Sequence, residues 1–418
     1  MSKPFYDELE VRDPGERDAA VAVALRQQLA HAVMHSPAMA ERLGNSPWAE
    51  VASVADLARL PVTRKYELLA QQQATRGHMA FGGFAAVSYG PLMRRVFASP
   101  GPIYEPEGSH ADYWRMGRAL YAAGFRSGDL IHNSFSYHLT PAGSMMETGA
   151  HAIGCTVFPG GVGNTEQQLA AMLDLQPQGY VGTPSFLKIL LEKATEANVQ
   201  LSIRKAMVSG EACPPSLVAW FAERGVTVYQ CYATADVGLI AYETEARQGL
   251  VVDEGVVVEI VRPGTNDPVT EGEVGEVVVT PLNPTYPLVR FGTGDLSAVL
   301  AGPCPTGRTH MRIKGWMGRA DQTTKIRGMF VHPGQIAEVI KRFEGLGKAR
   351  LVVTGELAND RMTLSVESAA DAATLAQRKP ELEQALRDVT KLRGEVVWAA
   401  PGSLPNDGKV IEDARTYE

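Results

Sequence analysis

The stretch from Asp112 to Ala233 constrains the fold of this chain most strongly, because strand-like apolar runs alternate there with helix-like runs. The strand-like runs are DLIHNSF, CTVFPGG, GYVGTPS, KAMVSGE and VTVYQCYA, and runs with helical spacing such as FLKILLEKATEA separate them. This alternation is typical of a parallel sheet with helices on both faces. Such sheets bind ligands beyond the carboxyl ends of their strands. We therefore expect a ligand site where PGG, GTPS, SGEA and YATAD stand.

The remaining segments extend this α/β fold at both ends. Residues 16–45 read as one Ala-rich helix, and a proline break separates two shorter helices after it. From Gly249 the chain changes to short strands and turns, which predicts an antiparallel sub-barrel with hairpins. A smaller unit of strands and helices begins near Asp321. The predicted architecture is α/β, with a large N-terminal domain over residues 1–320 that contains mixed and parallel sheets, and a small α+β domain over residues 321–418.

Composition limits the classes of protein that the chain can represent. Its 418 residues exceed one ordinary core, and 45% hydrophobic with 21% charged residues is typical of a soluble globular protein. No apolar run reaches the roughly 18 residues of a membrane span, and the charged start has no apolar signal core, so no membrane partner is expected. A net charge of −7 without a basic stripe argues against nucleic acid. The cysteines are widely spaced without a CxxC pair, which favours a reducing cytoplasm.

One segment, FASPGPIYEP at residues 97–106, has the composition of a loop that holds a ligand but lacks the usual residues for phosphate. Loops that bind phosphate are rich in Gly, Ser, Thr and Lys, because they work through backbone N–H groups and a cation. This segment has one Gly, three Pro without N–H groups, and two acids nearby, Glu105 and Glu107. It is either a degenerate phosphate loop or a loop with a different task.

Six further segments carry candidate chemistry, and each has an ordinary alternative. GTPS, YATAD and FGTGD could be simple turns, SGEA could end a strand and cap a helix, DQTTKIRG could be a surface hairpin, and NDGK could be a solvated tail. Taken together in this order, they resemble the adenylate-forming superfamily of acyl-CoA synthetases, adenylation domains and luciferases, and most of all its phenylacetate–CoA ligase branch. The resemblance runs from about residue 50 to the end, and GRADQTTKIRG is its most specific segment.

The resemblance implies a two-step reaction. A carboxylate attacks the α-phosphate of ATP, which gives an acyl-adenylate and pyrophosphate, and the thiol of coenzyme A then attacks the adenylate. The small C-terminal domain is implied to be mobile and to swing about a hinge at Asp321 between the steps. The expected cofactors are ATP, Mg²⁺ and coenzyme A, and the expected partner is a small carboxylic acid, with a homodimer as a further expectation.

By motif, the resemblance assigns residues to the base and the ribose. Gly210, Glu211 and Ala212 would line the adenine, and the aromatic face of Tyr232 would flank the base. Asp295 of FGTGD would accept hydrogen bonds from the ribose hydroxyls.

Other residues are assigned to the phosphates and the metal. Thr234 would approach the α-phosphate, and Lys409 would neutralise charge on the reacting oxygens, so both are assigned as catalytic. Asp236 stands where the family has a metal-binding Glu and is the expected Mg²⁺ ligand. Arg319 would reach the ribose and phosphates.

The KIRG segment is assigned to cofactor binding. It supplies Lys325 and Gly328, and the glycine would let the pantetheine arm pass close to the backbone.

The chain departs from the family pattern in three places. Gly292 replaces the Arg of the usual FRTGD-like motif. Some members of the family have a structural zinc site with four ligands. Only one of these, Cys304, is present in this chain, so no zinc is expected there. The segment 97–106 lies where the phosphate loop belongs, and Ser99 and the Gly101 N–H remain as contacts for pyrophosphate. We therefore expect weaker ATP affinity with the chemistry retained.

The family's acid pocket corresponds to five positions here: Phe135, Tyr137, His138, Phe186 and Ala235. Their aromatic character suggests an arylacetate such as phenylacetate or indoleacetate, although aromatic residues also serve as core.

The leading interpretation is an AMP-forming aryl-acid–CoA ligase. One alternative is an adenylating enzyme with another acceptor, and another is a catalytically weak homologue that binds nucleotide or acyl-CoA. Retention of Lys409, Asp295 and Asp236 argues against the last.

Overall fold

The chain forms two compact units, Met1–Gly318 and Arg319–Glu418. The computed structural model describes residues 4–263, 265–317, 320, 322, 324–327, 329–331, 333–355, 360–405 and 409–415, with the backbone alone at residues 325, 330 and 334. Each unit has a hydrophobic core of its own.

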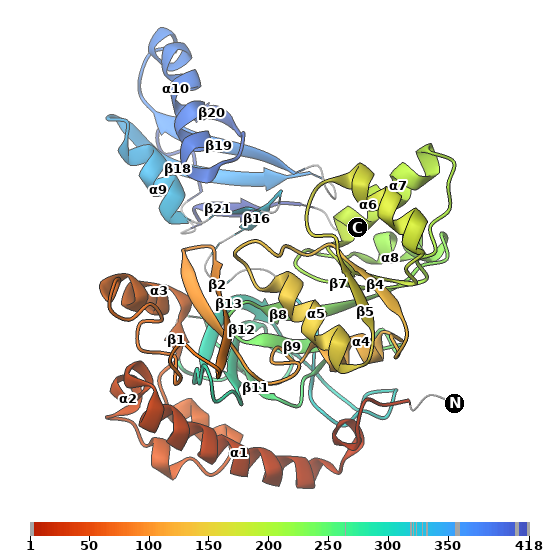
Figure 1. Ribbon diagram of the computed structural model, residues 1–418. Coiled ribbons are helices and arrows are strands. Elements are labelled where there is room, and N and C mark those ends of the chain that lie inside the picture. Colours follow the sequence, from red (N-terminus) through yellow and green to blue (C-terminus); the bar gives the residue numbers. More distant parts are fainter. Residues whose placement is uncertain are drawn as a thin grey trace. The chain divides into compact units, whose positions relative to one another are not determined.

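Among the described residues, the main sheet of the first unit has nine strands in the order β14-β15-β10-β9-β8-β7-β6-β4-β5 (Figure 1). The parallel strands are β4 (Leu130–Asn133), β5 (Thr156–Pro159), β6 (Gly179–Gly182), β7 (Lys205–Val208) and β8 (Thr227–Thr234). The antiparallel strands are β9 (Gly238–Glu243), β10 (Leu250–Val252), β14 (Val299–Leu300) and β15 (Arg312–Ile313). The alternation in the sequence therefore predicted the parallel part correctly.

Helices cover this sheet as its crossover connections require. The helices α4 (Met116–Ala122) and α5 (Ala142–Ala152) pack together, and α5 links β4 to β5. The helices α6 (Thr165–Leu175), α7 (Pro184–Glu196) and α8 (Pro215–Ala222) link the strands from β5 to β8. The chain moves one way along the sheet from β4 to β5 and the other way from β5 onward, so right-handed crossovers place α5 and α6–α8 on opposite faces. The connections after β4 and β6 therefore diverge, which makes the space beyond these two strands a favoured ligand position.

The N-terminal part is helical, but the single helix predicted over residues 16–45 is wrong. Two helices occur there, α1 (Pro14–His35) and α2 (Pro37–Leu43), after a 3-10 turn at η1 (Glu8–Val11). Ser36 lies between them in an extended conformation, and its hydroxyl accepts from the N–H of Met39 at 3.3 Å. A proline disfavours helical geometry at the residue before it, which explains the break at Ser36. Two 3-10 turns follow, η2 (Trp48–Glu50) and η3 (Val54–Arg59).

A second sheet has the order β1-β13-β12-β11. Its strands are β1 (Thr63–Arg64), β11 (Val256–Val261), β12 (Gly275–Pro281) and β13 (Phe291–Ser297). The short β1 pairs in parallel with β13, opposite Phe291 and Gly292. The helix α3 (Lys65–Ala74) begins directly after it, so this pairing fixes the position of Lys65.

The segment predicted as a loop at residues 97–106 is instead most of a β-hairpin. It consists of β2 (Met93–Ser99) and β3 (Ile103–Gly108), which pair antiparallel with Ser99 opposite Ile103. The turn holds Pro100, Gly101 and Pro102, whereas the flanking residues, Pro106 among them, pair as strands. The phosphate-loop position is therefore a tight turn.

The second unit is an α+β unit. Its strands are β16 (Thr324–Ile326), β17 (Met329–Val331), β18 (Leu346–Thr354), β19 (Arg361–Ser368), β20 (Glu395–Ala399) and β21 (Ile411–Asp413), and its helices are α9 (Pro333–Lys341) and α10 (Ala372–Thr390). A sheet of order β20-β19-β18-β21 packs against the helices through Leu351, Leu364 and Leu386, which are fully buried. The predicted fold class is confirmed. In the described part of the chain, no helix has both the length and the apolar character to cross a membrane.

Candidate active site

The segments GTPS and SGEA meet beyond the carboxyl ends of β6 and β7. The hydroxyl of Ser185 donates to Oε2 of Glu211 at 2.5 Å, which joins the start of α7 to the end of β7. Gly210 is exposed, while Glu211 and Ala212 are half-buried. Gly210 has a φ of 80°, a conformation that glycine adopts without strain. The three residues predicted to line the adenine therefore lie on an accessible part of the sheet edge.

Tyr232 and Asp295, predicted to flank the base and bind the ribose, are in direct contact. The Tyr232 hydroxyl donates to Oδ2 of Asp295 at 2.8 Å and lies 3.1 Å from Oγ1 of Thr293. The indole N–H of Trp316 donates to the other carboxylate oxygen at 3.1 Å. Asp295 is 8% exposed, whereas Trp316 is 43% exposed. The sequence interpretation gave Trp316 no role, although it stands just before the quoted GRAD segment.

Asp236, the predicted metal ligand, forms an ion pair with Lys65. Nζ of Lys65 lies 2.8 Å from Oδ2 of Asp236, whose side chain is almost completely buried. Thr234, predicted to approach the α-phosphate, is half-buried at the end of β8, and its hydroxyl accepts from the N–H of Val237 at 3.4 Å. The sequence interpretation assigned no role to Lys65.

Asp236 has the chemistry of an Mg²⁺ ligand. Its Oδ1 atom is buried and has no hydrogen-bond partner among the described residues. A carboxylate oxygen is the ligand type that Mg²⁺ prefers, and this ion keeps several waters, so one protein carboxylate is a sufficient anchor. An ion held there would neutralise phosphate charge. The described residues contain no cluster of three or more His, Cys, Asp or Glu side chains suited to a metal.

The hairpin turn places Ser99 against a buried acid. Glu105 accepts from both the hydroxyl and the backbone N–H of Ser99, the latter at 3.2 Å. Burial, and then the nearby carboxylate of Asp236, raise the pKa of Glu105 to about 8, while Lys65 opposes the rise. Ser99, which was predicted to contact pyrophosphate, therefore has its hydroxyl and its N–H engaged in this structure. Gly101, whose N–H was the other predicted contact, lies at the exposed turn. Their role in binding pyrophosphate stays a prediction.

The residues assigned to the second unit are placed only in part. Lys409 is exposed, directly before Val410, whose N–H donates to Oε1 of Gln322 at 2.6 Å. Lys325 lies on β16, where the backbone alone is described. Arg319, Asp321 and Gly328 lie outside the described residues.

The five residues predicted to line the acid pocket have different environments. Phe135 is 8% exposed and belongs to the buried core of the first unit. Tyr137 and Ala235 are half-buried, Phe186 is half-buried in the first turn of α7, and His138 is exposed. Tyr137 follows β4, at the point where the crossover connections diverge.

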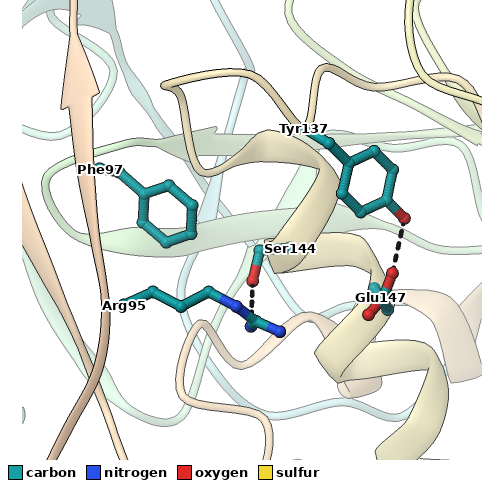
Figure 2. Close-up of a pocket in the computed structure, with 5 residues that line it drawn as sticks. All are labelled: Arg95, Phe97, Tyr137, Ser144 and Glu147. Atoms are coloured by element: carbon teal, nitrogen blue, oxygen red, sulfur yellow. Dashed lines mark hydrogen bonds between the residues drawn. The ribbon is translucent and has the colours of Figure 1, made fainter.

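Tyr137 lines a cavity of about 110 Å³ together with Arg95, Phe97, Ser144 and Glu147 (Figure 2). Arg95 and Phe97 come from β2, and Ser144 and Glu147 from α5. The other four residues predicted for the acid pocket do not line this cavity, and the sequence interpretation missed the four that do.

Comparison with known proteins identifies the family. Residues 111–282 match the model of the AMP-binding enzymes, and residues 328–414 match that of their C-terminal domain. A phenylacetate-coenzyme A ligase of Thermus thermophilus is 32% identical over 331 residues, which cover 75% of this chain and 72% of that protein. The chain belongs to the AMP-binding enzyme family. The predicted resemblance to the adenylate-forming superfamily and its phenylacetate–CoA ligase branch is confirmed.

Two further proteins are similar to this AMP-binding enzyme over nearly its full length. A phenylacetate-coenzyme A ligase of Escherichia coli is 28% identical over 435 residues, which cover 96% of this chain and 95% of that protein. A crystal structure of 2-hydroxyisobutyryl-CoA ligase in complex with 2-HIB-AMP and CoA superposes with a TM-score of 0.84 at 26% identity, covering 99% of this chain and 93% of that chain.

Proposed function

We propose that this AMP-binding enzyme is an AMP-forming carboxylic acid–CoA ligase that activates a small aromatic acid of the arylacetate type. ATP, Mg²⁺ and coenzyme A are its cofactors. The observation that carries the proposal is the arrangement at the end of β8. Tyr232 contacts the buried carboxylate of Asp295. Asp236, which lies four residues after Tyr232 in the chain, pairs with Lys65. The carboxylate of Asp295, on β13, is thereby held beside the end of β8 that carries Asp236. The first carboxylate is proposed to bind the ribose, and the second the metal ion.

In the first step, an oxygen of the substrate carboxylate bonds to the α-phosphorus, and pyrophosphate leaves with the bonding electron pair. Asp295 holds the ribose, the aromatic face of Tyr232 flanks the base, and the Thr234 hydroxyl donates toward the α-phosphate. Lys409 supplies positive charge to the reacting oxygens, a form of electrostatic stabilisation suited to a mobile ammonium group. In the second step the thiol of coenzyme A loses its proton to solvent, its sulfur bonds to the acyl carbon, and AMP leaves with the former carboxylate oxygen.

The arylacetate assignment draws support from the relatives, which are phenylacetate-coenzyme A ligases. The position of Tyr137 beside the divergence of β4 and β6 agrees with a pocket for the acid. We also propose that the C-terminal domain, residues 321–418, swings about Asp321 between the two steps. A homodimer belongs to the same proposal. Lys325, Arg319 and Gly328 keep their proposed cofactor contacts in it.

The proposal is tested by acid-dependent pyrophosphate release with a panel of aryl acids, with and without coenzyme A. We expect release with at least one arylacetate, and thioester formation when coenzyme A is present. Release without a thioester would favour an enzyme with another acceptor. No release with any acid would favour a homologue that only binds nucleotide or acyl-CoA.

A further inference from the structure

The cavity beside Tyr137 has a position that suits the acid but a lining that is more polar than an arylacetate needs. Of its five side chains, Phe97 alone is wholly apolar. Figure 2 shows Arg95 and Ser144 on one side and Tyr137 above Glu147 on the other. No residue assigned to the nucleotide lines it. The carboxylate of the acid must reach the α-phosphate, which is assigned to Thr234, and Thr234 does not line this cavity.

One side of the cavity is a closed hydrogen-bond network. The buried Glu107 accepts from Arg95 at 2.8 Å, from Ser144 at 2.7 Å and from the indole of Trp114 at 2.8 Å. Arg95 also donates to Ser144 at 2.7 Å. The positive charge of Arg95 is therefore matched by Glu107, and this side of the cavity adds no net charge.

The other side leaves a carboxylate incompletely satisfied. Oε2 of Glu147 accepts from the Tyr137 hydroxyl at 2.8 Å, and that hydroxyl accepts from Asn133 at 2.8 Å. Among the described residues, Oε1 of Glu147 accepts no hydrogen bond and no Lys or Arg pairs with this carboxylate. Glu147 is half-buried, so an occupant that displaces water from the cavity must replace the lost hydrogen bonds.

We propose that the cavity receives the end of the acid remote from its carboxylate, and that Glu147 selects acids carrying a hydroxyl or amino group there. The inference rests on the proposed function and adds the substrate class. A donor group on the substrate hydrogen-bonds to Oε1 of Glu147. A substrate without such a group displaces water from this carboxylate and leaves the oxygen without a partner. The cavity, at about 110 Å³, is smaller than the roughly 150 Å³ that admits benzene, so it fits a polar substituent and its neighbouring carbons better than a whole ring.

The selectivity is set by one charged hydrogen bond. A site built to bind a substrate donor discriminates strongly against the analogue without it, because the group on the protein is then left unpaired. A single bond to a charged group corresponds to roughly 10- to 100-fold in kcat/KM. Arg95 and Ser144 hold the opposite wall through Glu107 and do not decide between the two kinds of acid.

The test compares phenylacetate, 4-hydroxyphenylacetate, 4-aminophenylacetate and 4-methoxyphenylacetate. The last carries a similar oxygen without a donor. We expect kcat/KM for pyrophosphate release to be at least roughly 10-fold higher with 4-hydroxyphenylacetate or 4-aminophenylacetate than with phenylacetate or 4-methoxyphenylacetate. In Glu147→Leu this preference falls to about one while KM for ATP stays unchanged. The exposed Glu223→Leu, which keeps the wild-type preference, is the matched control.

Calorimetric titration of the same acids into the protein separates this inference from the proposed function. Selective binding of 4-hydroxyphenylacetate or 4-aminophenylacetate that Glu147→Leu abolishes supports the inference, even if no acid yields pyrophosphate. In that case the proposed function fails, and the inference about the cavity does not. Equal binding and equal kcat/KM for all four acids in the wild-type protein, or a preference that survives Glu147→Leu, overturns it.

Discussion

Nζ of Lys65 lies 2.8 Å from Oδ2 of Asp236, although the two residues are 171 positions apart in the chain. The pairing of β1 with β13 brings them together, because it fixes the start of α3 beside the strands that end at the site. The hairpin turn at residues 100–102 lacks the Lys of a usual phosphate loop, and Lys65 provides a cation on the same side of the site. The buried Glu105 interacts electrostatically with both Lys65 and Asp236.

Lys65→Met tests whether this cation serves the phosphates. Removing it leaves a buried carboxylate without its ion partner, so we expect acid-dependent pyrophosphate release to fall by roughly 100-fold, with a raised KM for ATP. We also expect about 1–3 kcal/mol lower stability, less than for a fully buried pair because the Lys side chain is about one-third exposed. Lys65→Arg is the control that keeps the charge. Unchanged pyrophosphate release in Lys65→Met would show that the pair is structural only.

Lys409→Ala separates the two half-reactions. Since the ammonium is proposed to stabilise charge in adenylate formation alone, we expect that step to slow by roughly 100- to 1000-fold. Thioester formation from a chemically prepared acyl-adenylate should stay within about 3-fold of wild type, well inside the size of a single charged contact. Lys391→Ala, at the exposed end of α10, is the control. Adenylation that survives in Lys409→Ala would rule out the proposed role.

Tyr232→Phe probes the nucleotide side. The change removes the 2.8 Å hydrogen bond to Asp295 but keeps the aromatic face and the contact between Asp295 and Trp316. We expect KM for ATP to rise roughly 10- to 100-fold with kcat nearly unchanged, the size of one hydrogen bond to a charged group. Steady-state kinetics at saturating acid measure this. A drop in kcat with an unchanged KM would place Tyr232 in the chemical step instead.

The sequence allowed the parallel sheet and the motif positions to be predicted because their signals are local. Each of the strands from β4 to β8 is a short apolar run between helical segments, and Tyr232, Asp236 and Asp295 stand inside recognisable segments. The hairpin at β2 and β3 was misread because Pro100, Gly101 and Pro102 of its short turn, together with Pro106 on β3, dominated the composition of the whole segment.

The contacts that complete the site could not be predicted in the same way. Lys65 and Trp316 reach their partners through the pairing of distant strands, which no local pattern encodes. Arg95 and Glu147 are ordinary surface-type residues in a strand and a helix, and their position at one cavity depends on how β2 packs against α5. Phe135 shows the converse, since its aromatic character suggested a pocket and it is a core residue.

Asp112→Asn tests a pH-dependent contribution to stability outside the site. Burial raises the pKa of Asp112 from 3.8 to about 7, against the opposing hydrogen bond from the Gly117 N–H. The folded state therefore favours the protonated acid, and this stabilising contribution is present at low pH and lost as pH rises from about 4 through about 7.

The neutral Asn escapes that loss, so Asp112→Asn should gain about 2–4 kcal/mol relative to wild type at pH 8 and much less at pH 4. Chemical denaturation of both proteins at the two pH values measures the difference. The same change in stability at both values would contradict the raised pKa.

The central claim is that a carboxylate oxygen attacks the α-phosphorus of ATP. It is tested most directly with an acid labelled with ¹⁸O in both carboxylate oxygens, incubated with the enzyme, ATP, Mg²⁺ and coenzyme A, followed by mass spectrometry of the nucleotide. The account predicts AMP carrying one ¹⁸O atom, together with unlabelled pyrophosphate and an acyl-CoA that retains the other label. Formation of ADP with label in inorganic phosphate, or of AMP without label, would contradict it.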